Sequence, residues 1–330
     1  MSSRYLRWGL ICTARINRRL IPAIRAAERS ELVAVASRDL ARAQVYARQW
    51  DIPRAHGGYE ALLADPEVDV IYNALPNHLH CEWTVRAVEA GKHVLCEKPL
   101  ALSVREVDRI EEAARRNRVV VFEAFMYRHH PQTLKVQDLV REGAIGTVRL
   151  VQATFAFTLE NPGDYRLDAA QGGGALWDVG CYPVSFARAI LGAEPVEVAG
   201  WQRPGGSGVD MTFAGQMRFA GGALAQFGCS FEAAYYCTAQ ILGSAGTIVL
   251  DSPWRLGGDH SQGIRLRRGS GEELLPVESI DPYLCEVQAM EACIFDGAAP
   301  VVPLSDSRGN VATINALYES ARRGAPVSLG

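Results

Sequence analysis

Two short segments of the chain carry side chains that could move a proton. Glu97-Lys98-Pro99 ends an apolar stretch, and Asp178 and Tyr182 stand four residues apart in a stretch with helical spacing. Residues four apart share one face of a helix. Removing hydrogen from an alcohol requires a base for the hydroxyl proton, and a free tyrosine, with a pKa of about 10, is protonated near neutrality. These residue types indicate alcohol–carbonyl chemistry, provided that another group activates the tyrosine.

A lysine ammonium is the group that could activate the tyrosine. A positive charge within about 4–6 Å stabilises tyrosinate and lowers its pKa. We therefore predict that Tyr182 accepts the proton, that Lys98 is its electrostatic partner, and that Asp178 orients the substrate or Lys98. A second assignment stays open, in which Lys98 is the base and Tyr182 relays the proton. In a purely structural interpretation, Tyr182 is a packed helix residue and Asp178 a surface carboxylate.

The first third of the chain predicts the framework that positions Lys98. Apolar stretches typical of buried strands occupy residues 6–12, 31–37, 68–75, 93–97 and 119–122, and stretches with helical spacing occupy 17–28, 40–49, 81–90 and 103–116. Continuous apolar strands joined by amphipathic helices indicate a parallel sheet covered on both faces. Lys98 would then lie at the carboxyl edge of the sheet, where open α/β sheets bind their ligands.

The turn after the first predicted strand is a candidate dinucleotide site. In this turn Cys12, Ala14 and Asn17 occupy the positions of the three glycines of the dinucleotide fingerprint. The alternative interpretation is an ordinary strand-to-helix turn. The dinucleotide interpretation is supported by the small residues at two of the three positions and by Thr13, which can add a hydroxyl donor.

The end of the second predicted strand bears on which nicotinamide cofactor is bound. NAD sites commonly place an acidic residue there to accept the ribose 2′-hydroxyl. This chain has Ser37-Arg38, a hydroxyl and a guanidinium suited to a 2′-phosphate. Asp39 follows directly and is the alternative ribose contact. The sequence therefore favours NADP, with NAD left open.

From residue 147 onward the pattern changes. Strands are expected at 147–157, 196–202, 211–219, 223–231, 237–243 and 247–250, with helices at 174–191, 283–295 and 305–323. We predict an α/β protein with two domains. Residues 1–125 form a Rossmann domain with a doubly wound parallel sheet, and residues 126–330 form an α+β domain with a large, mostly antiparallel open sheet. The final helix is a candidate to pack back on the first domain.

Composition excludes several classes of function. The chain has 330 residues and a formal net charge of −3, which argues against nucleic acid as an obligatory partner. No apolar run approaches the roughly 18 residues that cross a bilayer, and no secretory signal is recognisable, so we expect a cytoplasmic protein without a membrane partner. The eight cysteines form no CxxC pair, and His78 and His80 lack further ligands at metal spacing. We therefore predict no metal site.

Four segments together are more specific than any single residue. They are 77–80 (Asn-His-Leu-His), 90–99 (which ends in Glu-Lys-Pro), 123–128 (Glu-Ala-Phe-Met-Tyr-Arg) and 172–183 (which contains Asp178 and Tyr182). The chain resembles the glucose-fructose oxidoreductase / inositol dehydrogenase / MocA (Gfo/Idh/MocA) family over essentially its whole length. Within that family it is most similar to the branch of dimeric dihydrodiol dehydrogenases and NADP-dependent D-xylose dehydrogenases.

The resemblance implies an activity and further site residues. It implies hydride transfer between NADP(H) and the carbinol or carbonyl of a sugar, cyclic polyol or vicinal diol, by a homodimer or homotetramer assembled through the second-domain sheet. It adds cofactor contacts, largely through the backbone, at Thr13, Ala14, Arg15, Ile16, Leu75, Pro76, Asn77, His80, Glu97, Lys98 and Arg166, and substrate-pocket positions at Tyr127, Trp177 and Tyr283. Arg166 would hold the nicotinamide or a substrate hydroxyl. The alternatives are a cofactor-binding sensor or co-repressor without turnover, and a ketoreductase acting on a nucleotide-linked sugar.

Overall fold

The computed structural model describes residues 5–256 and 263–329 and divides the chain into two compact units. The first unit runs to Met126 and also includes Asp281–Arg308. The second unit comprises Tyr127–Ile280 and the chain from Gly309 onward. This division differs from the expected one chiefly at 281–308, a segment that the sequence analysis assigned to the second domain.

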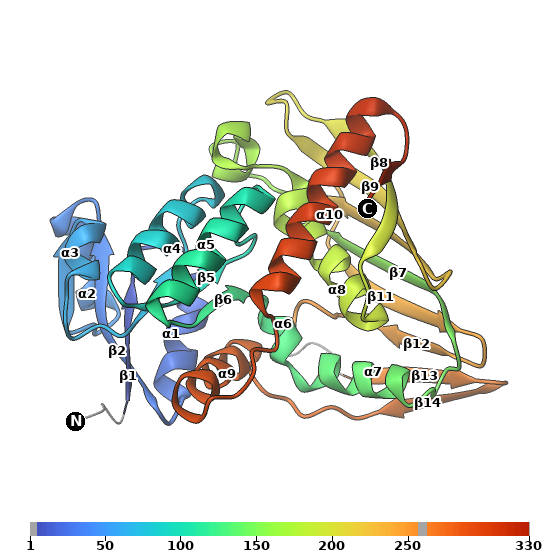
Figure 1. Cartoon of the computed structure of the whole chain (residues 1–330), viewed down its shortest axis with the longest axis horizontal. Coiled ribbons are helices and arrows are strands. Elements are labelled where there is room, and N and C mark those ends of the chain that lie inside the picture. The colour runs from blue at the N-terminus through green and yellow to red at the C-terminus, as the bar shows by residue number, and fades with distance from the viewer. Residues whose placement is uncertain (1–4, 257–262, 330) are drawn as a thin grey trace. The chain divides into compact units, whose positions relative to one another are not determined.

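The described part of the first unit contains a six-stranded sheet in the order β3-β2-β1-β4-β5-β6 (Figure 1). Every neighbouring pair is parallel, as in a doubly wound Rossmann sheet. The strands are β1 (Leu6–Leu10), β2 (Ser30–Ser37), β3 (Arg54–Gly57), β4 (Val70–Asn73), β5 (His93–Glu97) and β6 (Val121–Ala124). The short β3 was missed in the sequence because its residues are only partly buried or exposed.

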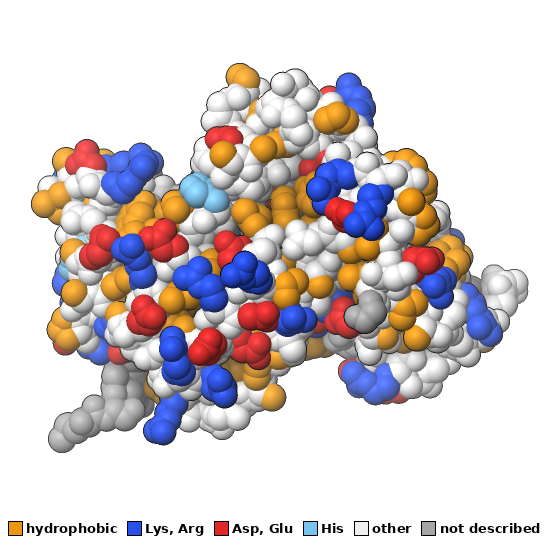
Figure 2. All heavy atoms as spheres, turned by 45° about the horizontal axis from the view of Figure 1, so that its top comes forward, with side chains coloured by type: hydrophobic (Ala, Val, Ile, Leu, Met, Phe, Trp, Pro, Cys, Tyr) orange, Lys and Arg blue, Asp and Glu red, His pale blue; other side chains and the backbone are white. Residues whose placement is uncertain are grey.

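The helices of the first unit follow the strands in alternation. They are α1 (Asn17–Ala26), α2 (Leu40–Gln49), α3 (Tyr59–Leu63), η1 (Asn77–Leu79), α4 (His80–Glu89), α5 (Val104–Asn117) and α9 (Pro282–Asp296), with α6 (Met126–His129) at the boundary of the unit. A capping box fixes the start of α5, because Ser103 accepts from the Glu106 amide and Glu106 accepts from the Ser103 amide. Figure 2 shows basic and acidic side chains interspersed over the exposed face of α4 and α5.

Helix α9 completes the core of the first unit. Its Val287 and Met290 are fully buried in one cluster with Leu20 and Ile24 of α1 and with Tyr72 of β4. The sequence analysis proposed the final helix as the one that returns to the first domain. The preceding helix, α9, belongs to this core, because its apolar side chains cover α1 and the strands beside it. The start of the final helix, up to Arg308, belongs to the same unit, and Arg308 pairs with Asp108 of α5.

The described part of the second unit contains a nine-stranded sheet in the order β14-β13-β12-β11-β7-β10-β9-β8-β15. The strands are β7 (Val148–Ala156), β8 (Pro195–Pro204), β9 (Asp210–Phe219), β10 (Leu224–Ser230), β11 (Tyr236–Gly243), β12 (Thr247–Leu250), β13 (Ile264–Arg268), β14 (Gly271–Leu275) and β15 (Val327–Ser328). Only the central β7–β10 pair of these described strands is parallel. The predicted mostly antiparallel sheet is confirmed.

Helices cover one face of this sheet. They are α7 (Pro131–Arg141), α8 (Cys181–Leu191) and α10 (Leu304–Arg323), together with the short turns η2 (Tyr165–Leu167), η3 (Ala169–Gln171) and η4 (Leu176–Gly180). Leu317 of α10 contacts the sheet where Gly200 and Gly215 leave room for it. The unit division falls within α10, between Arg308 and Gly309.

Candidate active site

The loop that follows β1 has Cys12, Ala14 and Asn17 in place of the fingerprint glycines. The side chains of Cys12 and Asn17 form hydrogen bonds with backbone carbonyl groups. The thiol of Cys12 points to the carbonyl oxygen of Ala74, with Sγ and O 3.2 Å apart. The buried Asn17 donates from Nδ2 to the Cys12 carbonyl oxygen at 2.7 Å and thereby closes the turn. Burial raises the pKa of the Cys12 thiol to about 12, so no thiolate opposes a phosphate here. The loop therefore fits a pyrophosphate, with Thr13, Ala14, Arg15 and Ile16 between the two anchored positions.

The end of β2 presents positive charge. Asp39 is used as the N-cap of α2, where it accepts from the Ala41 amide at 2.8 Å, and its side chain is therefore engaged locally. Arg38 and Arg42 are exposed, and the positive charges of both act on the hydroxyl of Tyr59. Within the part of the chain that the structure describes, neither guanidinium has an ion-pair partner. Ser37 is buried beside them.

The end of β5 carries the predicted Glu97 and Lys98, beside the neighbouring strand β4. The Tyr72 hydroxyl donates to Glu97 Oε1 at 2.5 Å, so the Glu97 carboxylate is tied to the neighbouring strand. Tyr283, at the start of α9, lies near both residues, because the charges of Glu97 and Lys98 act on its hydroxyl. The structure thus brings three predicted residues, Glu97, Lys98 and Tyr283, into one group in the first unit.

A buried carboxyl group that the sequence analysis missed adjoins this group. Glu286 of α9 is 1% exposed, and among residues 5–256 and 263–329 neither of its carboxyl oxygens has a hydrogen-bond partner. Burial is the main cause that raises its pKa, and the nearby Glu97 charge adds to the effect. Burial therefore favours the protonated form of Glu286 in the folded protein. A helix position one turn after Tyr283 was its only signal in the sequence.

His80, predicted as a cofactor contact, is fully buried. Its Nδ1 lies 2.7 Å from the Pro99 carbonyl oxygen and its Nε2 lies 2.7 Å from the Leu75 carbonyl oxygen. Asn73 supports the same segment by donating from Nδ2 to the His80 carbonyl and to Thr84 Oγ1. The His80 ring therefore links the segment that contains Leu75 to the segment that contains Pro99, and both segments include predicted cofactor contacts.

In the second unit, Asp178 lies in a π-helical turn. This turn, η4, immediately precedes α8, whereas the sequence analysis predicted one regular helix over 174–191. Single π-turns within helices are frequent at functional sites, and they change which side chains share a face. Asp178 is buried and pairs with Arg166, whose Nε donates to Oδ2 at 2.8 Å. Arg166 also contacts Asp164 and lies over the ring of Tyr165.

Tyr182 lies among aromatic rings. Its ring centroid is 5.8 Å from that of Tyr127, 5.5 Å from that of Phe155 and 6.0 Å from that of Trp254. Tyr127 is fully buried, and its hydroxyl donates to Ser185 at 2.8 Å. This places Tyr127, predicted as a substrate contact, in the packing layer that holds the Tyr182 ring.

A second carboxylate, which the sequence analysis missed, fixes the start of this helical region. Asp210 of β9 accepts from the Leu176 amide at 2.7 Å and from the Tyr318 hydroxyl at 2.6 Å. Gly174 has φ of +120°, and a Cβ there would lie 2.2 Å from the Asp210 carboxylate oxygen. Tyr318 also packs on Trp177, with centroids 5.9 Å apart. The three-glycine run at 172–174 was the only hint of this arrangement in the sequence.

The predicted catalytic residues are divided between the two units. Lys98 belongs to the first unit, and Asp178 and Tyr182 belong to the second. Over residues 5–256 and 263–329, no group of three or more His, Cys, Asp or Glu side chains is arranged to hold a metal ion. No helix in the same ranges is both long and apolar enough to cross a bilayer.

Family models match both parts of the chain. The model of the oxidoreductase family with an NAD-binding Rossmann fold matches residues 6–125, and the Gfo/Idh/MocA C-terminal domain model matches residues 133–249. The fold and the site thus define an oxidoreductase with an NAD-binding domain. The chain belongs to the Gfo/Idh/MocA family, as the sequence analysis predicted.

Individual relatives are similar over most of their length. The NADP(+) D-xylose 1-dehydrogenase of Haloferax volcanii is 37% identical and covers 98% of this chain and 99% of its own. The trans-1,2-dihydrobenzene-1,2-diol dehydrogenase of Danio rerio is 37% identical over 74% of this chain and 73% of its own.

Solved structures agree with these relatives. An aldose-aldose oxidoreductase from Caulobacter crescentus in complex with glycerol matches with a TM-score of 0.92 and 28% identity, over 99% of this chain and 100% of its own. A 3-ketoreductase from Actinomadura kijaniata, in complex with NADP and TDP-benzene, matches with a TM-score of 0.89 and 32% identity, over 96% and 98% of the two chains.

Proposed function

We propose that this protein is an NADP(H)-dependent dehydrogenase that acts on a carbinol of a sugar, cyclic polyol or vicinal diol, with oxidation of an aldose at C1 as the leading reaction. One arrangement carries the proposal. The buried ring of Tyr182, with its hydroxyl, follows the π-turn by two residues. The same π-turn contains Asp178, which forms an ion pair with Arg166. The D-xylose and dihydrodiol dehydrogenases among its relatives support this substrate class.

A nicotinamide cofactor, when bound, would supply the hydride acceptor for this chemistry, and the chain's own residues handle the proton. Tyr182 takes the proton of the substrate hydroxyl, and Lys98 stabilises the tyrosinate and positions that hydroxyl. Asp178, held by Arg166, accepts a hydrogen bond from a neighbouring substrate hydroxyl. Trp177 and Tyr283 line the substrate side, and Tyr127 supports Tyr182 from behind. In the alternative assignment Lys98 is the base and Tyr182 relays the proton.

NADP fits the end of β2 better than NAD. The two exposed guanidiniums of Arg38 and Arg42 suit a dianionic 2′-phosphate. Asp39 is occupied as the cap of α2 and is poorly placed to accept a ribose hydroxyl. The pyrophosphate would lie on the Thr13–Ile16 loop, with further contacts from Leu75, Pro76, Asn77 and Glu97. NAD remains the alternative cofactor.

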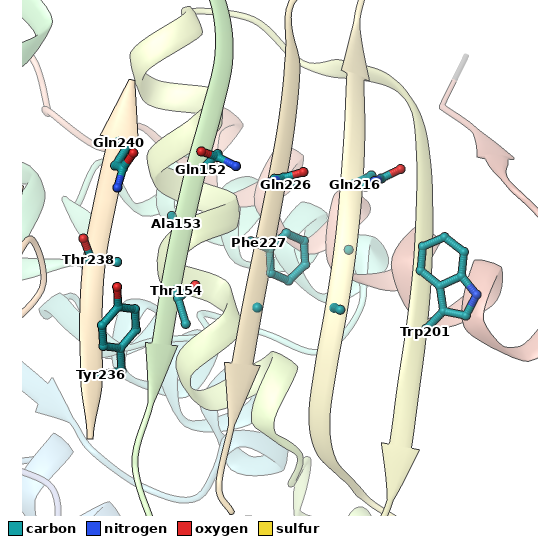
Figure 3. Close-up of a pocket in the computed structure, with 13 residues that line it drawn as sticks. Gln152, Ala153, Thr154, Trp201, Gln216, Gln226, Phe227, Tyr236, Thr238 and Gln240 are labelled. Carbon is teal, nitrogen blue, oxygen red and sulfur yellow. The ribbon is translucent and has the colours of Figure 1, made fainter. Parts of the chain in front are cut away.

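A second copy of the chain is the proposed partner, through the open face of the second sheet. Four glutamines align across this face in register, on β11, β7, β10 and β9: Gln240, Gln152, Gln226 and Gln216 (Figure 3). Trp201 and Tyr236 are 62% and 56% exposed on the same face. An amide both donates and accepts hydrogen bonds, so this face is complementary to itself and suits a homodimer or homotetramer.

The cysteines bear on the location of the protein. Six cysteines are free thiols, and four of these are buried: Cys81, Cys96, Cys229 and Cys237 are buried, and Cys12 and Cys293 are partly exposed. Free thiols are typical of a reducing compartment, and on this ground we propose a cytoplasmic protein.

The experiment that tests the function is an assay of reduced-nicotinamide formation. NADP+ and NAD+ are each offered with aldoses, inositols and trans-diols, and cofactor binding is measured separately by fluorescence. Turnover with NADP+ and an aldose supports the leading reaction. Cofactor binding without turnover on any substrate supports a sensor. Activity only in the reductive direction on a nucleotide-linked keto sugar supports a ketoreductase, the second candidate favoured by the similarity to the Actinomadura kijaniata enzyme.

A further inference from the structure

The π-turn that carries Asp178 begins without a capping side chain of its own. Ala175 occupies the N-cap position, where its methyl group cannot accept a hydrogen bond. Three glycines, residues 172–174, precede it and have no side chains to offer. The first amide groups of a helical segment have no acceptor within that segment. Acceptors for the amides of this turn must therefore come from elsewhere in the chain.

Asp210 of β9 supplies the cap from outside the turn. Its Oδ2 accepts from the Leu176 amide at 2.7 Å, and its Oδ1 accepts from the Tyr318 hydroxyl at 2.6 Å. Burial raises the pKa of the Asp210 carboxyl group to about 6, whereas the hydrogen bonds from Tyr318 and Leu176 act in the opposite direction. At pH 7.5 this group is therefore ionised, and a negative charge is favourable at the first turn of a helix.

Tyr318 of α10 extends the cap to the ring of Trp177. The two ring centroids are 5.9 Å apart, and Tyr318 also packs edge-on against Phe213 of β9, with centroids 5.7 Å apart. Burial raises the pKa of the Tyr318 hydroxyl, and the Asp210 charge adds to the effect, so this hydroxyl keeps the proton that it donates. Strand β9 thus fixes Tyr318 at both its ring and its hydroxyl, and Trp177 packs on the fixed ring.

The other end of the π-turn is held by packing. A Cβ at Gly180 would lie 2.8 Å from Sγ of Cys229 on β10, so the backbone of the turn lies directly against this strand. Burial raises the pKa of the Cys229 thiol, and the nearby charges of Asp210 and Asp178 act in the same direction. A neutral thiol therefore lies near both carboxylates. Asp178 is placed between one fixed point at Leu176 and another at Gly180.

We propose that Asp210 and Tyr318 are positioning residues for the substrate side of the site. They hold the π-turn by the Leu176 amide and by the Trp177 ring, and so they set the direction in which Trp177 and Asp178 face the substrate. This effect rests on the proposed function, in which Trp177 lines the substrate side and Asp178 binds a substrate hydroxyl. The contacts of the anchor do not depend on that function.

The anchor is tested by 19F NMR of the full-length protein labelled with fluorotryptophan. The Trp177 signal is assigned by its loss in Trp177→Phe. In Asp210→Asn, which keeps an oxygen acceptor but removes the charge, the Trp177 signal should shift or split, while that of Trp83 in the first unit stays in place. Asp251→Asn, at an exposed carboxylate that follows β12, is the matched control. An unchanged Trp177 signal in Asp210→Asn would overturn the anchor, whatever the enzyme activity.

A second variant decides the anchor if Asp210→Asn does not fold. Tyr318→Phe removes only the hydroxyl that Asp210 accepts from, and it keeps a ring against Trp177. The Trp177 signal should move in this variant also, and it should stay in place in Tyr235→Phe, at an exposed tyrosine. A Trp177 signal at its wild-type position in Tyr318→Phe would refute the part of Tyr318 in the anchor.

The effect on the substrate is tested by steady-state kinetics. In Asp210→Asn, KM for the substrate should rise by about tenfold, and KM for NADP+ should change by less than about threefold. A purely structural role would lower the fraction of active enzyme, and with it the apparent kcat, without changing either KM. Unchanged KM for the substrate would overturn the positioning role. If the wild-type protein turns over no substrate, the proposed function and the effect on the substrate fail together, and the 19F experiments still decide the anchor.

Discussion

The Arg166 guanidinium lies 2.8 Å from the Asp178 carboxylate, Nε to Oδ2, and both residues belong to the same unit. The sequence analysis considered each of them separately, Arg166 for the nicotinamide or a substrate hydroxyl and Asp178 for the substrate or Lys98. As a pair they present one carboxylate of fixed orientation, because Arg166 occupies the Oδ2 side.

This pairing predicts the outcome of a double-mutant cycle. Arg166→Met and Asp178→Asn should each lower kcat/KM by roughly a hundredfold, and the double variant should lose little more than either single variant. The measurement is steady-state kinetics, with Arg141→Met, an exposed arginine, as the control. Additive losses would show that the two side chains act independently.

Proton transfer should depend on Tyr182 and Lys98. Tyr182→Phe removes the hydroxyl and Lys98→Met removes the charge while each keeps much of the side-chain volume, so kcat should fall by about a hundredfold or more. Cofactor affinity, measured by fluorescence titration, should change far less for Tyr182→Phe. Tyr235→Phe and Lys135→Met are the matched controls. Full turnover in either test variant would refute the catalytic assignment.

Glu286 should make folding stability depend on pH. Its pKa is raised in the folded protein, so the folded state retains a proton that the unfolded state releases above its ordinary pKa of about 4.3. Stability therefore falls as pH rises through that range. Glu286→Gln should raise Tm, and the gain should be larger at pH 8 than at pH 5, by differential scanning fluorimetry. The exposed Glu112→Gln is the control, and a gain independent of pH would contradict a buried, protonated Glu286.

Arg38 should discriminate between the cofactors. Arg38→Ala removes a charge-assisted contact to the 2′-phosphate, and KM for NADP+ should rise by about ten- to a hundredfold, while KM for NAD+ should change little. Arg105→Ala, on the exposed face of α5, serves as the control. An equal effect on the two cofactors would place the 2′-phosphate elsewhere.

The glutamine face should hold two copies of the chain together. Gln226→Glu places like charges opposite each other across a symmetric interface, and it should shift the protein toward monomers in sedimentation velocity at micromolar concentration. Val45→Glu, at a side chain 58% exposed on α2 in the first unit, should not. If the wild-type protein is a monomer at that concentration, the proposed interface is wrong.

Periodicity predicted the fold well where strands are fully buried. The stretches around β1, β2, β4 and β5 were recognised because each is a continuous apolar run, and the alternating strands β7 to β11 because one face is buried and the other is not. Strands β3 and β14 show neither a continuous apolar run nor a buried face, because their residues are partly buried or exposed. The register was also hidden. The parallel β7–β10 pair joins Gln152 and Gln226, which are 74 residues apart in sequence (226 − 152), and no local pattern encodes such a pairing.

The candidate site was predictable only in part. Lys98, Asp178 and Tyr182 stand out by residue type, whereas Asp210 and Glu286 are single carboxylates whose importance comes from burial and from partners distant in sequence. The π-turn at 176–180 was likewise invisible, because its residues have ordinary helical character.

The return of α9 to the first unit has a consequence for synthesis on the ribosome. Val287 and Met290 belong to the core of a unit whose other main segment ends at Met126. Residues 127–280 therefore leave the ribosome before that core can close. Until α9 is synthesised, the nascent Rossmann segment exposes the apolar surface that α9 later covers. A gene fragment that encodes this segment alone would therefore yield a domain that depends on chaperones.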